Sequence, residues 1–306
     1  MPQLIVVFGG SGFIGRHVVA KLAKTGARIR VAVRHPNLAS RVFPMGDPGQ
    51  IAAVRCDVTD EAQVAAAVAG ADVVVNLVGI LAEWGARSFD AVQAGGAGIV
   101  ARAAHAAGAT SFVHMSAIGA DPQSESGYAR TKAEGEAQVL EQFPDALILR
   151  PSIVFGPEDG FFNRFGSMAT WSPVLPVFGG GETKMQPVFV GDVAEALTRG
   201  LARGERGVFE LGGARAYTFR ELMDYVRHVT GLRPLLLPLP WWMGSVMGAV
   251  LEWLPGQMLT RDQVALLRRD NVVSPGARGL KELGIAPVPV EAVVPDAEMS
   301  ASAVVE

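Results

Sequence analysis

The sequence predicts an α/β protein with a doubly wound parallel sheet, and two observations carry this prediction. Through about residue 155, short apolar runs rich in β-branched residues alternate with stretches whose apolar residues recur at helical spacing. Strands joined in this way by helices are typical of a parallel sheet with right-handed crossovers. Directly after the first apolar run, a glycine-rich turn leads into the first helical stretch.

Each expected element of this half follows from its own residues. The strands are runs that suit burial on both faces, and the helices end at glycines or begin at acidic residues. The expected strands span 4–8, 27–33, 51–56, 72–78, 111–116 and 146–155. The expected helices span 16–24, 59–68, 89–107 and 128–143. In such sheets a ligand lies beyond the carboxyl ends of the strands, so functional residues are expected there.

Composition and charge exclude several classes of protein. Of 306 residues, 49% are hydrophobic and 19% are charged, with a formal net charge of −3, so no nucleic-acid partner is expected. The single Cys56 excludes an internal disulfide, and the 5 histidines lack ligand spacing, so no metal is expected. A strand begins at Leu4, so we expect no signal or transit peptide in the chain as given, and no transmembrane span.

The glycine-rich turn predicts a dinucleotide site. Strand, turn and helix follow one another, with Gly9, Gly12 and Gly15 at spacing that also fits a motif starting at Gly10. The first glycine permits the tight turn, Gly12 lets the backbone approach a pyrophosphate, and Gly15 lets the helix pack closely on the strand. The free amides of the first helical turn, around Phe13 and Ile14, then face the anion.

The residues after the second and third strands indicate which dinucleotide binds. Arg34 stands where an NAD-selective protein places an acid, and its planar guanidinium suits the 2′-phosphate of NADPH. Arg16 and His35 would add to the same positive patch. The alternative is that Arg34 is an ordinary surface arginine. Asp57 either accepts a hydrogen bond from the adenine amino group or caps the following helix.

Six motifs occur in the order found in the extended short-chain dehydrogenase/reductases, which the chain resembles to about residue 230. They are Gly9-x-x-Gly12-x-x-Gly15, Asp57-Val58, Asn76-x-x-Gly79, Tyr128-x-x-x-Lys132, Arg150-Pro151-x-x-Val154-Phe155-Gly156 and Val190-Gly191-Asp192-Val193-Ala194. The resemblance implies a Rossmann sheet with a smaller, interleaved C-terminal α/β lobe. It implies further cofactor contacts from Val58, Leu77, Val78, Gly79, Ser116, Tyr128, Lys132, Pro151 and Ile153.

The resemblance also implies catalytic roles, with one departure. Tyr128 and Lys132 are four residues apart on an expected helix, so they share a face, and an ammonium beside a phenol lowers the pKa of the phenol. In the family, the tyrosine is the general acid/base and the lysine binds the nicotinamide ribose. Ala117 occupies the position of the family's Ser or Thr, while Ser116 comes one place early and is expected to face the other side of the sheet. We therefore expect an incomplete catalytic set.

A narrower resemblance lies in residues 155–165, where Phe-Gly-x-Glu-Asp is followed by Phe161, Phe162, Asn163 and Phe165. This segment is similar to the NADPH-binding accessory subunit of respiratory complex I and its bacterial relatives. The resemblance implies NADPH as the cofactor, complex I subunits as partners, and no turnover of its own. It also implies a peripheral place on the cytoplasmic side of a bacterial inner membrane, or on the matrix side of a mitochondrial one. The three phenylalanines are also expected to pack in the core of the smaller lobe.

We expect the dinucleotide-binding domain over 1–155 and the smaller lobe over 156–306, with 186–213 returning to the main domain. Expected elements of the second half are helices at 161–171, 192–202 and 218–230, a turn at 179–181 and a strand at 208–211. Residues 241–254 carry three tryptophans and one charge, too short a run to span a bilayer. This run is either a buried helix of the lobe, which we favour, or a surface facing a partner or membrane. Residues 286–306 are expected to form an extended, partly disordered tail.

Two classes of function follow. The preferred one is an NADPH-holding accessory or assembly subunit of respiratory complex I without its own turnover. The alternative is an NAD(P)-dependent epimerase, dehydratase or reductase acting on a nucleotide sugar or small carbonyl compound. A redox-sensing regulator with the same fold is a third. Tyr128 favours the enzyme, whereas Ala117 and the motif at 155–165 favour the subunit.

Overall fold

The computed structural model of the 306-residue chain describes residues 3–253 and 259–294. Its packing divides the chain into two compact units, each assembled from separate stretches. Unit 1 consists of Met1–Arg150, Val193–Glu210 and Arg278–Ile285, and unit 2 of Pro151–Asp192, Leu211–Ala277 and Ala286–Glu306. The stretch from Arg278 to Ile285 within unit 1 lies outside the segment 186–213 that the sequence suggested would return to the main domain.

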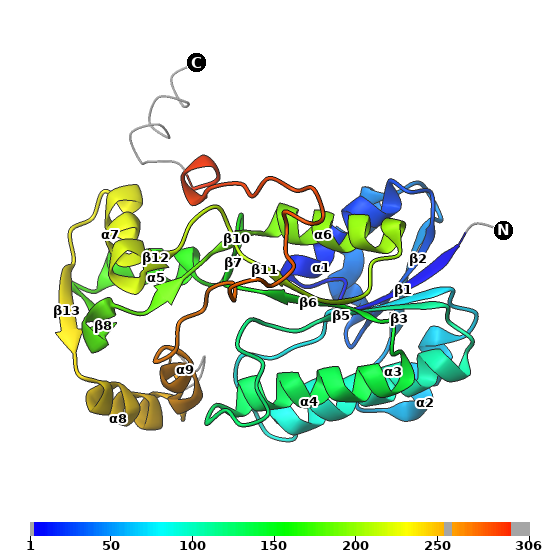
Figure 1. The fold of residues 1–306 in the computed structure, drawn as a ribbon, viewed down its shortest axis with the longest axis horizontal. Coiled ribbons are helices and arrows are strands. Elements are labelled where there is room, and N and C mark those ends of the chain that lie inside the picture. Colours follow the sequence, from blue (N-terminus) through cyan, green and yellow to red (C-terminus); the bar gives the residue numbers. More distant parts are fainter. Residues whose placement is uncertain (1–2, 254–258, 295–306) are drawn as a thin grey trace, which may run out of the picture. The chain divides into compact units, whose positions relative to one another are not determined.

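Unit 1 is built around a seven-stranded sheet with the order β11-β6-β5-β4-β1-β2-β3, and every pairing from β6 across to β3 is parallel. The strands are β1 (Leu4–Phe8), β2 (Arg28–Val33), β3 (Ile51–Arg55), β4 (Val73–Asn76), β5 (Ser111–Met115), β6 (Leu147–Pro151) and β11 (Gly207–Leu211). The predicted doubly wound parallel sheet is therefore confirmed. Its central strands are buried on both faces, as their continuous apolar runs predict (Figure 1).

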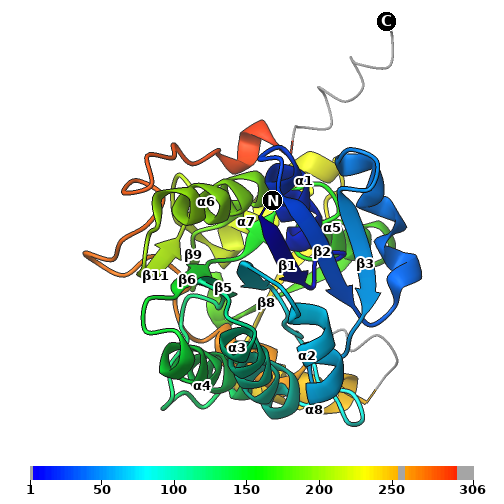
Figure 2. The same ribbon diagram turned by 90° about the vertical axis from the view of Figure 1, so that its right-hand side faces the viewer.

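Helices cover both faces of this sheet. In Figure 2, α2, α3 and α4 lie on one face and α1 and α6 on the other. Their bounds are α1 (Phe13–Ala23), α2 (Glu61–Val68), α3 (Gly96–Ala106), α4 (Gly127–Gln142) and α6 (Val190–Arg203). Short helical segments complete the unit at η1 (Pro36–Arg41), η2 (Phe43–Met45) and η3 (Asp90–Gly95). The expected helix at 89–107 thus opens with a π-helical stretch, η3, before α3.

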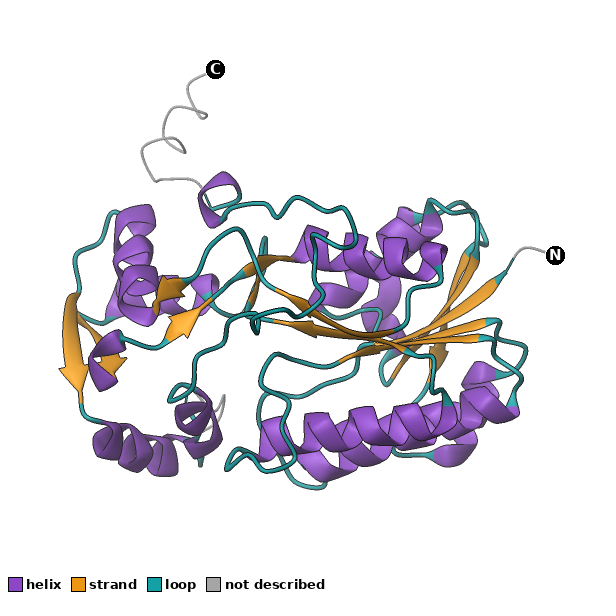
Figure 3. Cartoon of the chain, in the orientation of Figure 1, coloured by secondary structure: helices purple, strands orange, loops and turns teal. Residues whose placement is uncertain are grey.

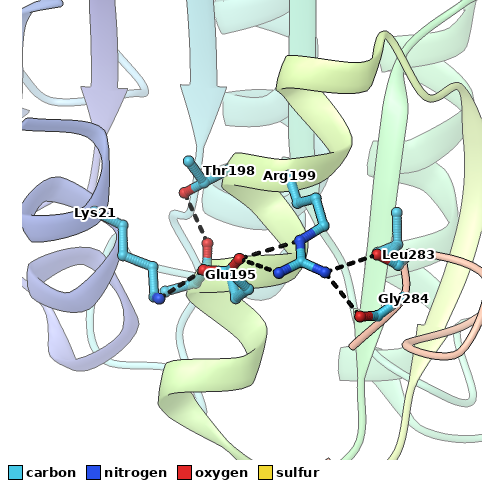
Figure 4. Close-up of polar contacts among 7 residues, drawn as sticks. Lys21, Glu195, Thr198, Arg199, Leu283 and Gly284 are labelled. Atoms are coloured by element: carbon cyan, nitrogen blue, oxygen red, sulfur yellow. Dashed lines mark hydrogen bonds and ion pairs between the residues drawn. The ribbon is translucent and has the colours of Figure 1, made fainter. Parts of the chain in front are cut away.

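Ion pairs and hydrogen bonds attach two late segments of the chain to the face of unit 1 that carries α1. Lys21 Nζ of α1 lies 2.6 Å from Glu195 Oε2 of α6. Arg199, one turn further along α6, contacts the same carboxylate at 2.7 Å and donates to the carbonyl of Gly284 at 2.8 Å (Figure 4). The hydrogen bond to Gly284 helps to make the stretch 278–285 part of unit 1, although this stretch is distant in sequence from the rest of that unit.

The expected strand at 146–155 is two strands, so that prediction is corrected. β6 ends at Pro151, and β7 (Val154–Phe155) pairs instead with β10 (Val188–Phe189) in unit 2. The chain changes its strand-pairing partner at Ser152. The Ser152 hydroxyl donates a hydrogen bond to the Asn271 side chain at 2.6 Å. Proline donates no backbone hydrogen bond, so it is a natural end for a central strand.

Unit 2 packs short sheets and helices around an aromatic core. Its helices are α5 (Phe162–Trp171), α7 (Phe219–Thr230), α8 (Trp241–Leu251) and α9 (Arg261–Leu266), with the 3-10 turns η4 (Gly179–Gly181) and η5 (Val290–Ala292) (Figure 3). The remaining strands are β8 (Val174–Phe178), β9 (Lys184–Met185), β12 (Tyr217–Thr218) and β13 (Leu235–Leu239). Phe161 stacks edge-on against Phe162 and Phe165, as the sequence predicts for core residues. Helix α7 begins with a capping box formed by Thr218 and Glu221.

Helix α8 is not buried, which corrects the favoured prediction for residues 241–251. Only Gly244 and Gly248 are buried, whereas Trp242 is 66% and Trp253 is 81% exposed. The two glycines decide this orientation because they let the helix approach Phe178 and the backbone of residues 260–261 closely. Trp242, Val246 and Val250 therefore face outward, whereas Trp241 is only partly exposed and packs against Gly179. Leu254, the last residue of the predicted run, lies outside the described residues.

The prediction of an extended tail is wrong for residues 286–294. Val290 is buried in the core of unit 2, and Val293 and Val294 pack against that core. The Tyr217 hydroxyl donates to Glu291 Oε1 at 2.9 Å. Residues 295–306 of the predicted tail lie outside the described residues.

Candidate functional site

A pocket of about 250 Å³ opens at the carboxyl ends of β1, β2, β3 and β4 in unit 1. The chain crosses the sheet after β3, so β4 lies beside β1 on the side opposite β2. In doubly wound folds this reversal creates the crevice in which ligands bind. Its lining residues are Gly9, Ser11, Gly12, Ala32, Val33, Arg34, His35, Leu38, Cys56, Asp57, Val58, Leu77, Val78, Gly79, Arg87 and Val92.

Glycines are required where β1 turns into α1. Gly9 has a φ of 76°, and its carbonyl accepts a hydrogen bond from the Gly12 amide at 3.0 Å. A Cβ on Gly15 would lie 2.2 Å from the Gly9 carbonyl oxygen, so only glycine allows this approach of helix to strand. A Cβ on Gly12 would lie 3.2 Å from the same oxygen, which is tight but not impossible.

The first turn of α1 presents amides suited to an anion. Gly12 is its N-cap and supplies no side-chain cap. The amides of Phe13, Ile14 and Gly15 belong to the first turn, where an α-helix has no internal acceptor for them. These groups and the positive helix end fit a pyrophosphate. The glycine cradle and its amides therefore fit the dinucleotide that the sequence predicts.

Charged groups line the pocket where β2 and β3 end. Arg34 and His35 follow β2, Asp57 follows β3, and Arg87 comes from the loop after β4. Burial alone would raise the pKa of Asp57, but hydrogen bonds from Thr59 and the charges of Arg34 and Arg87 hold it below its usual value. Burial, followed by the charge of Arg34, lowers the pKa of Arg87, and Asp57 opposes this. The three charges thus act on one another within one pocket.

Lys132 lies behind the pocket wall, beneath Gly79. Its Nζ donates to the Met115 carbonyl at 3.1 Å, and a Cβ on Gly79 would lie 3.1 Å from that nitrogen. Burial lowers the pKa of Lys132 to about 8, and the charge of Glu136 partly opposes the shift. Burial, followed by the charge of Lys132, lowers the pKa of His114 to about 3, so this histidine is neutral at pH 7. The ammonium is therefore a buried cation beside the pocket.

The candidate catalytic residues surround Lys132. Its Nζ lies 5.9 Å from the centre of the Tyr128 ring, which packs edge-on against Phe89 at 5.9 Å. Ser116 is buried, and its Oγ has no hydrogen-bond partner among the described residues. Ala117 follows it and is only partly buried. Tyrosine and lysine thus share a helix face, as their spacing predicts.

The pocket collects only part of the predicted set. Gly9, Gly12, Arg34, His35, Asp57, Val58, Leu77, Val78 and Gly79 line it. Phe13, Ile14, Gly15, Arg16, Ser116, Tyr128 and Lys132 belong to unit 1 without lining it, and Pro151 and Ile153 belong to unit 2.

Seven further residues line the pocket without having been predicted from the sequence: Ser11, Ala32, Val33, Leu38, Cys56, Arg87 and Val92. Most of these residues are sequence neighbours of predicted residues and lie close to the ends of strands. Arg87 is different because it lies eleven residues beyond the end of β4, in a loop without a recognised motif. No local pattern in the sequence marks it, because only the fold of the loop brings it to the strand ends.

The family follows from the sequence pattern of the NAD dependent epimerase/dehydratase family, which matches residues 5–212; the chain belongs to that family. The predicted resemblance is also confirmed at the level of relatives. The chain is 33% identical over 293 residues to NADH dehydrogenase (ubiquinone) 1 alpha subcomplex subunit 9 of Rattus norvegicus, covering 93% of this chain and 77% of that protein.

Two other comparisons bear on the site. Ceramide reductase of Caulobacter vibrioides is 34% identical over 239 residues, covering 78% of this chain and 74% of that protein. The structure of the NADPH-dependent quinone oxidoreductase QOR2 of Escherichia coli, complexed with NADPH, superposes with a TM-score of 0.73. Its sequence is 22% identical, and the match covers 98% of this chain and 99% of that one, which shows the shared fold.

Within residues 3–253 and 259–294, no helix is both long and apolar enough to cross a membrane.

Proposed function

We propose that this chain is an accessory or assembly subunit of respiratory complex I that holds NADPH and has no turnover of its own. The observation that carries the proposal is the 33% identity to the mitochondrial alpha subcomplex subunit 9, which extends over 93% of this chain. The similarity therefore includes unit 2 as well as the dinucleotide-binding unit. Because the similarity covers both units, it favours a shared role as a subunit over a relationship limited to the nucleotide-binding fold.

The nucleotide we propose is NADPH. Arg34 stands at the end of β2 and lines the pocket, where an acid would suit the ribose hydroxyls of NAD. Asp57 would accept a hydrogen bond from adenine, and the first-turn amides of α1 would hold the pyrophosphate. Lys132, directly behind Gly79, would contact the nicotinamide ribose. Ser116, Tyr128, Pro151 and Ile153 remain proposed contacts at that end.

We propose that α8 contributes to docking near the membrane surface. Trp242, Val246 and Val250 recur along α8 at intervals of four residues, and Trp253 follows just beyond its end; all four are exposed. Tryptophan favours protein interfaces and the boundary between hydrocarbon and water. In a bacterial cell this surface would face the cytoplasmic side of the inner membrane; in an organelle it would face the matrix side.

The test is association with complex I in the cell that makes this chain. A tagged full-length protein should co-migrate with complex I on a native gel, and NADPH should be released when the purified protein is denatured. Arg34→Ala should lose NADPH and keep its capacity for NADH. Free migration of a folded, nucleotide-loaded protein would contradict the subunit role. Release of NADH alone would contradict the choice of nucleotide.

A second candidate function is an NADPH-dependent reductase. The 34% identity to ceramide reductase over 239 residues favours it, as does the Tyr128–Lys132 pair. Lys132 carries a lowered pKa, and a neighbouring ammonium favours ionisation of a phenol, which suits general acid/base work. The partly buried Ala117, in place of a substrate-orienting hydroxyl, argues against it. Turnover of ceramide-class or other carbonyl substrates by the purified protein would decide for the enzyme.

A further inference from the structure

Two guanidinium groups line the same end of the pocket. Arg34 follows β2, and Arg87 comes from the loop that connects β4 with η3. Within residues 3–253 and 259–294, neither guanidinium forms a hydrogen bond or an ion pair with another side chain. Side chains that are both charged and unpaired in a pocket are suited to a ligand of the opposite charge.

We propose that Arg87 is the second guanidinium that binds the 2′-phosphate of NADPH, facing the same phosphate as Arg34. This inference rests on the proposed NADPH function and goes beyond it. No motif of the sequence contains Arg87, because it lies in the long loop after β4. The tertiary structure brings it to the ends of β2 and β3.

A tight turn fixes the position of Arg87. The amide of Trp84 donates to the Arg87 carbonyl at 3.1 Å, and the Arg87 amide donates back to the Trp84 carbonyl at 3.0 Å. Gly85 within this turn has a φ of 58°, which favours glycine. The Glu83 side chain accepts the Phe89 amide at 2.6 Å and closes the loop against the next helical segment. The guanidinium therefore projects from an anchored backbone.

Electrostatics favour a phosphate between the two arginines. Arg34 and Arg87 repel one another, and Asp57 offsets only one of the two positive charges. The Oδ1 atom of Asp57 is already engaged by the Thr59 amide at 3.1 Å and hydroxyl at 2.9 Å. A phosphate dianion would relieve the repulsion and accept planar, two-point hydrogen bonds from each guanidinium. The neutral 2′-hydroxyl of NADH would leave the repulsion in place.

The 2′-phosphate is favoured over the pyrophosphate because of its place in the pocket. Gly9 and Gly12 with the start of α1 form the pyrophosphate cradle at the end of β1. Arg34, Asp57 and Arg87 act on one another electrostatically and lie at the ends of the neighbouring strands. The adenosine half of a dinucleotide extends toward those strands in a doubly wound sheet.

The test compares binding of 2′,5′-ADP and 5′-AMP to the full chain by calorimetry. These probes differ only in the 2′-phosphate, so the ratio of their affinities isolates that group. Arg87→Gln should lower the ratio at least tenfold and change 5′-AMP affinity less than threefold. Arg102→Gln, a surface arginine of α3 outside the pocket, should leave the ratio unchanged. The wild-type ratio should fall as the pH drops below about 6, where a phosphate monoester gains its second proton.

The outcomes separate this inference from the NADPH proposal. An unchanged ratio in Arg87→Gln, with a collapsed ratio in Arg34→Ala, would overturn the role of Arg87 and leave NADPH in place. Equal losses of both probes in Arg87→Gln would mean that Arg87 contacts adenine or only shapes the pocket. A wild-type ratio near one would overturn both proposals. If Arg87→Gln does not fold, Arg87→Lys decides, since a lysine cannot bind in two points and should still lower the ratio.

Discussion

Glu136 and Arg150 form a two-point ion pair between α4 and β6. Arg150 Nε lies 2.8 Å from Glu136 Oε1, and a terminal nitrogen of the same guanidinium lies 2.6 Å from Oε2. The two side chains are only 6% and 23% exposed. Glu136 also follows Lys132 by one helical turn and supports its charge against burial. Two separate motifs of the sequence therefore meet in one buried network.

Removing one partner of this pair should lower stability strongly. Glu136→Gln removes both short hydrogen bonds of Arg150 and leaves it only the longer contact with Glu210 at 3.8 Å, so the free energy of unfolding should fall by about 3 kcal/mol. Urea unfolding followed by circular dichroism measures this. Asp145→Asn is the matched control, because it removes the partner of Arg206 in a pair whose side chains are 70% and 64% exposed. That change should stay within about 1 kcal/mol. Equal losses in the two variants would contradict the importance of burial.

The buried ammonium of Lys132 should lower the free energy of unfolding at neutral pH. We expect this lysine to contribute to nucleotide binding instead. The pKa of Lys132 is about 8 in the folded protein, below its ordinary value of 10.5, so the unfolded chain binds more protons between these two values. The contribution of Lys132 to the free energy of unfolding therefore rises as the pH increases from 8 to 10.5, and it is fully unfavourable below pH 8.

Lys132→Met should then raise the free energy of unfolding at pH 7 by on the order of 1–2 kcal/mol and weaken NADPH binding. The gain should shrink between pH 8 and 10.5, as thermal melts at several pH values would record. Lys24→Met, at an exposed lysine, should show neither effect. A destabilised Lys132→Met variant at pH 7 would contradict this account.

Substitutions at Gly12 and Gly15 should have different effects, the first on nucleotide binding and the second on stability. Gly12→Val should fold but bind neither NADPH nor NADH, because its side chain fills the cradle while its Cβ meets only the Gly9 carbonyl at 3.2 Å. Gly15→Ala should be destabilised, since its Cβ would lie 2.2 Å from that oxygen and 2.7 Å from backbone atoms of Gly10. Melting temperature and nucleotide fluorescence distinguish these results. Gly160→Ala, in open space within unit 2, is the control. Nucleotide binding by Gly12→Val would argue against the cradle.

Tyr128 should be dispensable for a subunit and essential for an enzyme. With Ala117 at the substrate-orienting position, we expect no appreciable oxidation of bound NADPH by carbonyl or nucleotide-sugar substrates. Tyr128→Phe should keep co-migration with complex I on native gels. Robust turnover by the wild type, abolished in Tyr128→Phe, would establish the reductase instead.

The exposed tryptophans Trp242 of α8 and Trp253 just beyond its end should matter for docking and not for folding. Replacing both with serine removes two apolar side chains that are 66% and 81% exposed, so the melting temperature should change little. Association with complex I should be lost, as measured by co-purification, while NADPH binding persists. Trp171→Ser, at a tryptophan of α5 that is 64% exposed, controls for loss of any surface tryptophan. Unfolding of the double variant would place α8 in the core.

The course of the main sheet could be predicted because its signals are local. A buried strand, a tight turn and an amphipathic helix are each written in consecutive residues, as in residues 4–8, 9–12 and 13–23. The order of such segments then restricts the topology to a parallel sheet with its site at the strand ends. Arg34 and Asp57 were found because they directly follow strands. The branch of the family was also recognisable, since the motif at 155–165 is contiguous.

The doubly wound sheet, the glycine cradle and the family thus follow from local patterns in the sequence. The shared pocket of Arg87 and Arg34 does not, because their proximity depends on how a long loop folds back over the strand ends. The tertiary structure also brings residues 278–285 into unit 1, through the carbonyl of Gly284 and the side chain of Arg199. The outward face of α8 is a third case. The sequence of an apolar helix does not indicate which of its sides packs, and here the side with the two glycines makes the closest approach, which leaves Trp242 exposed.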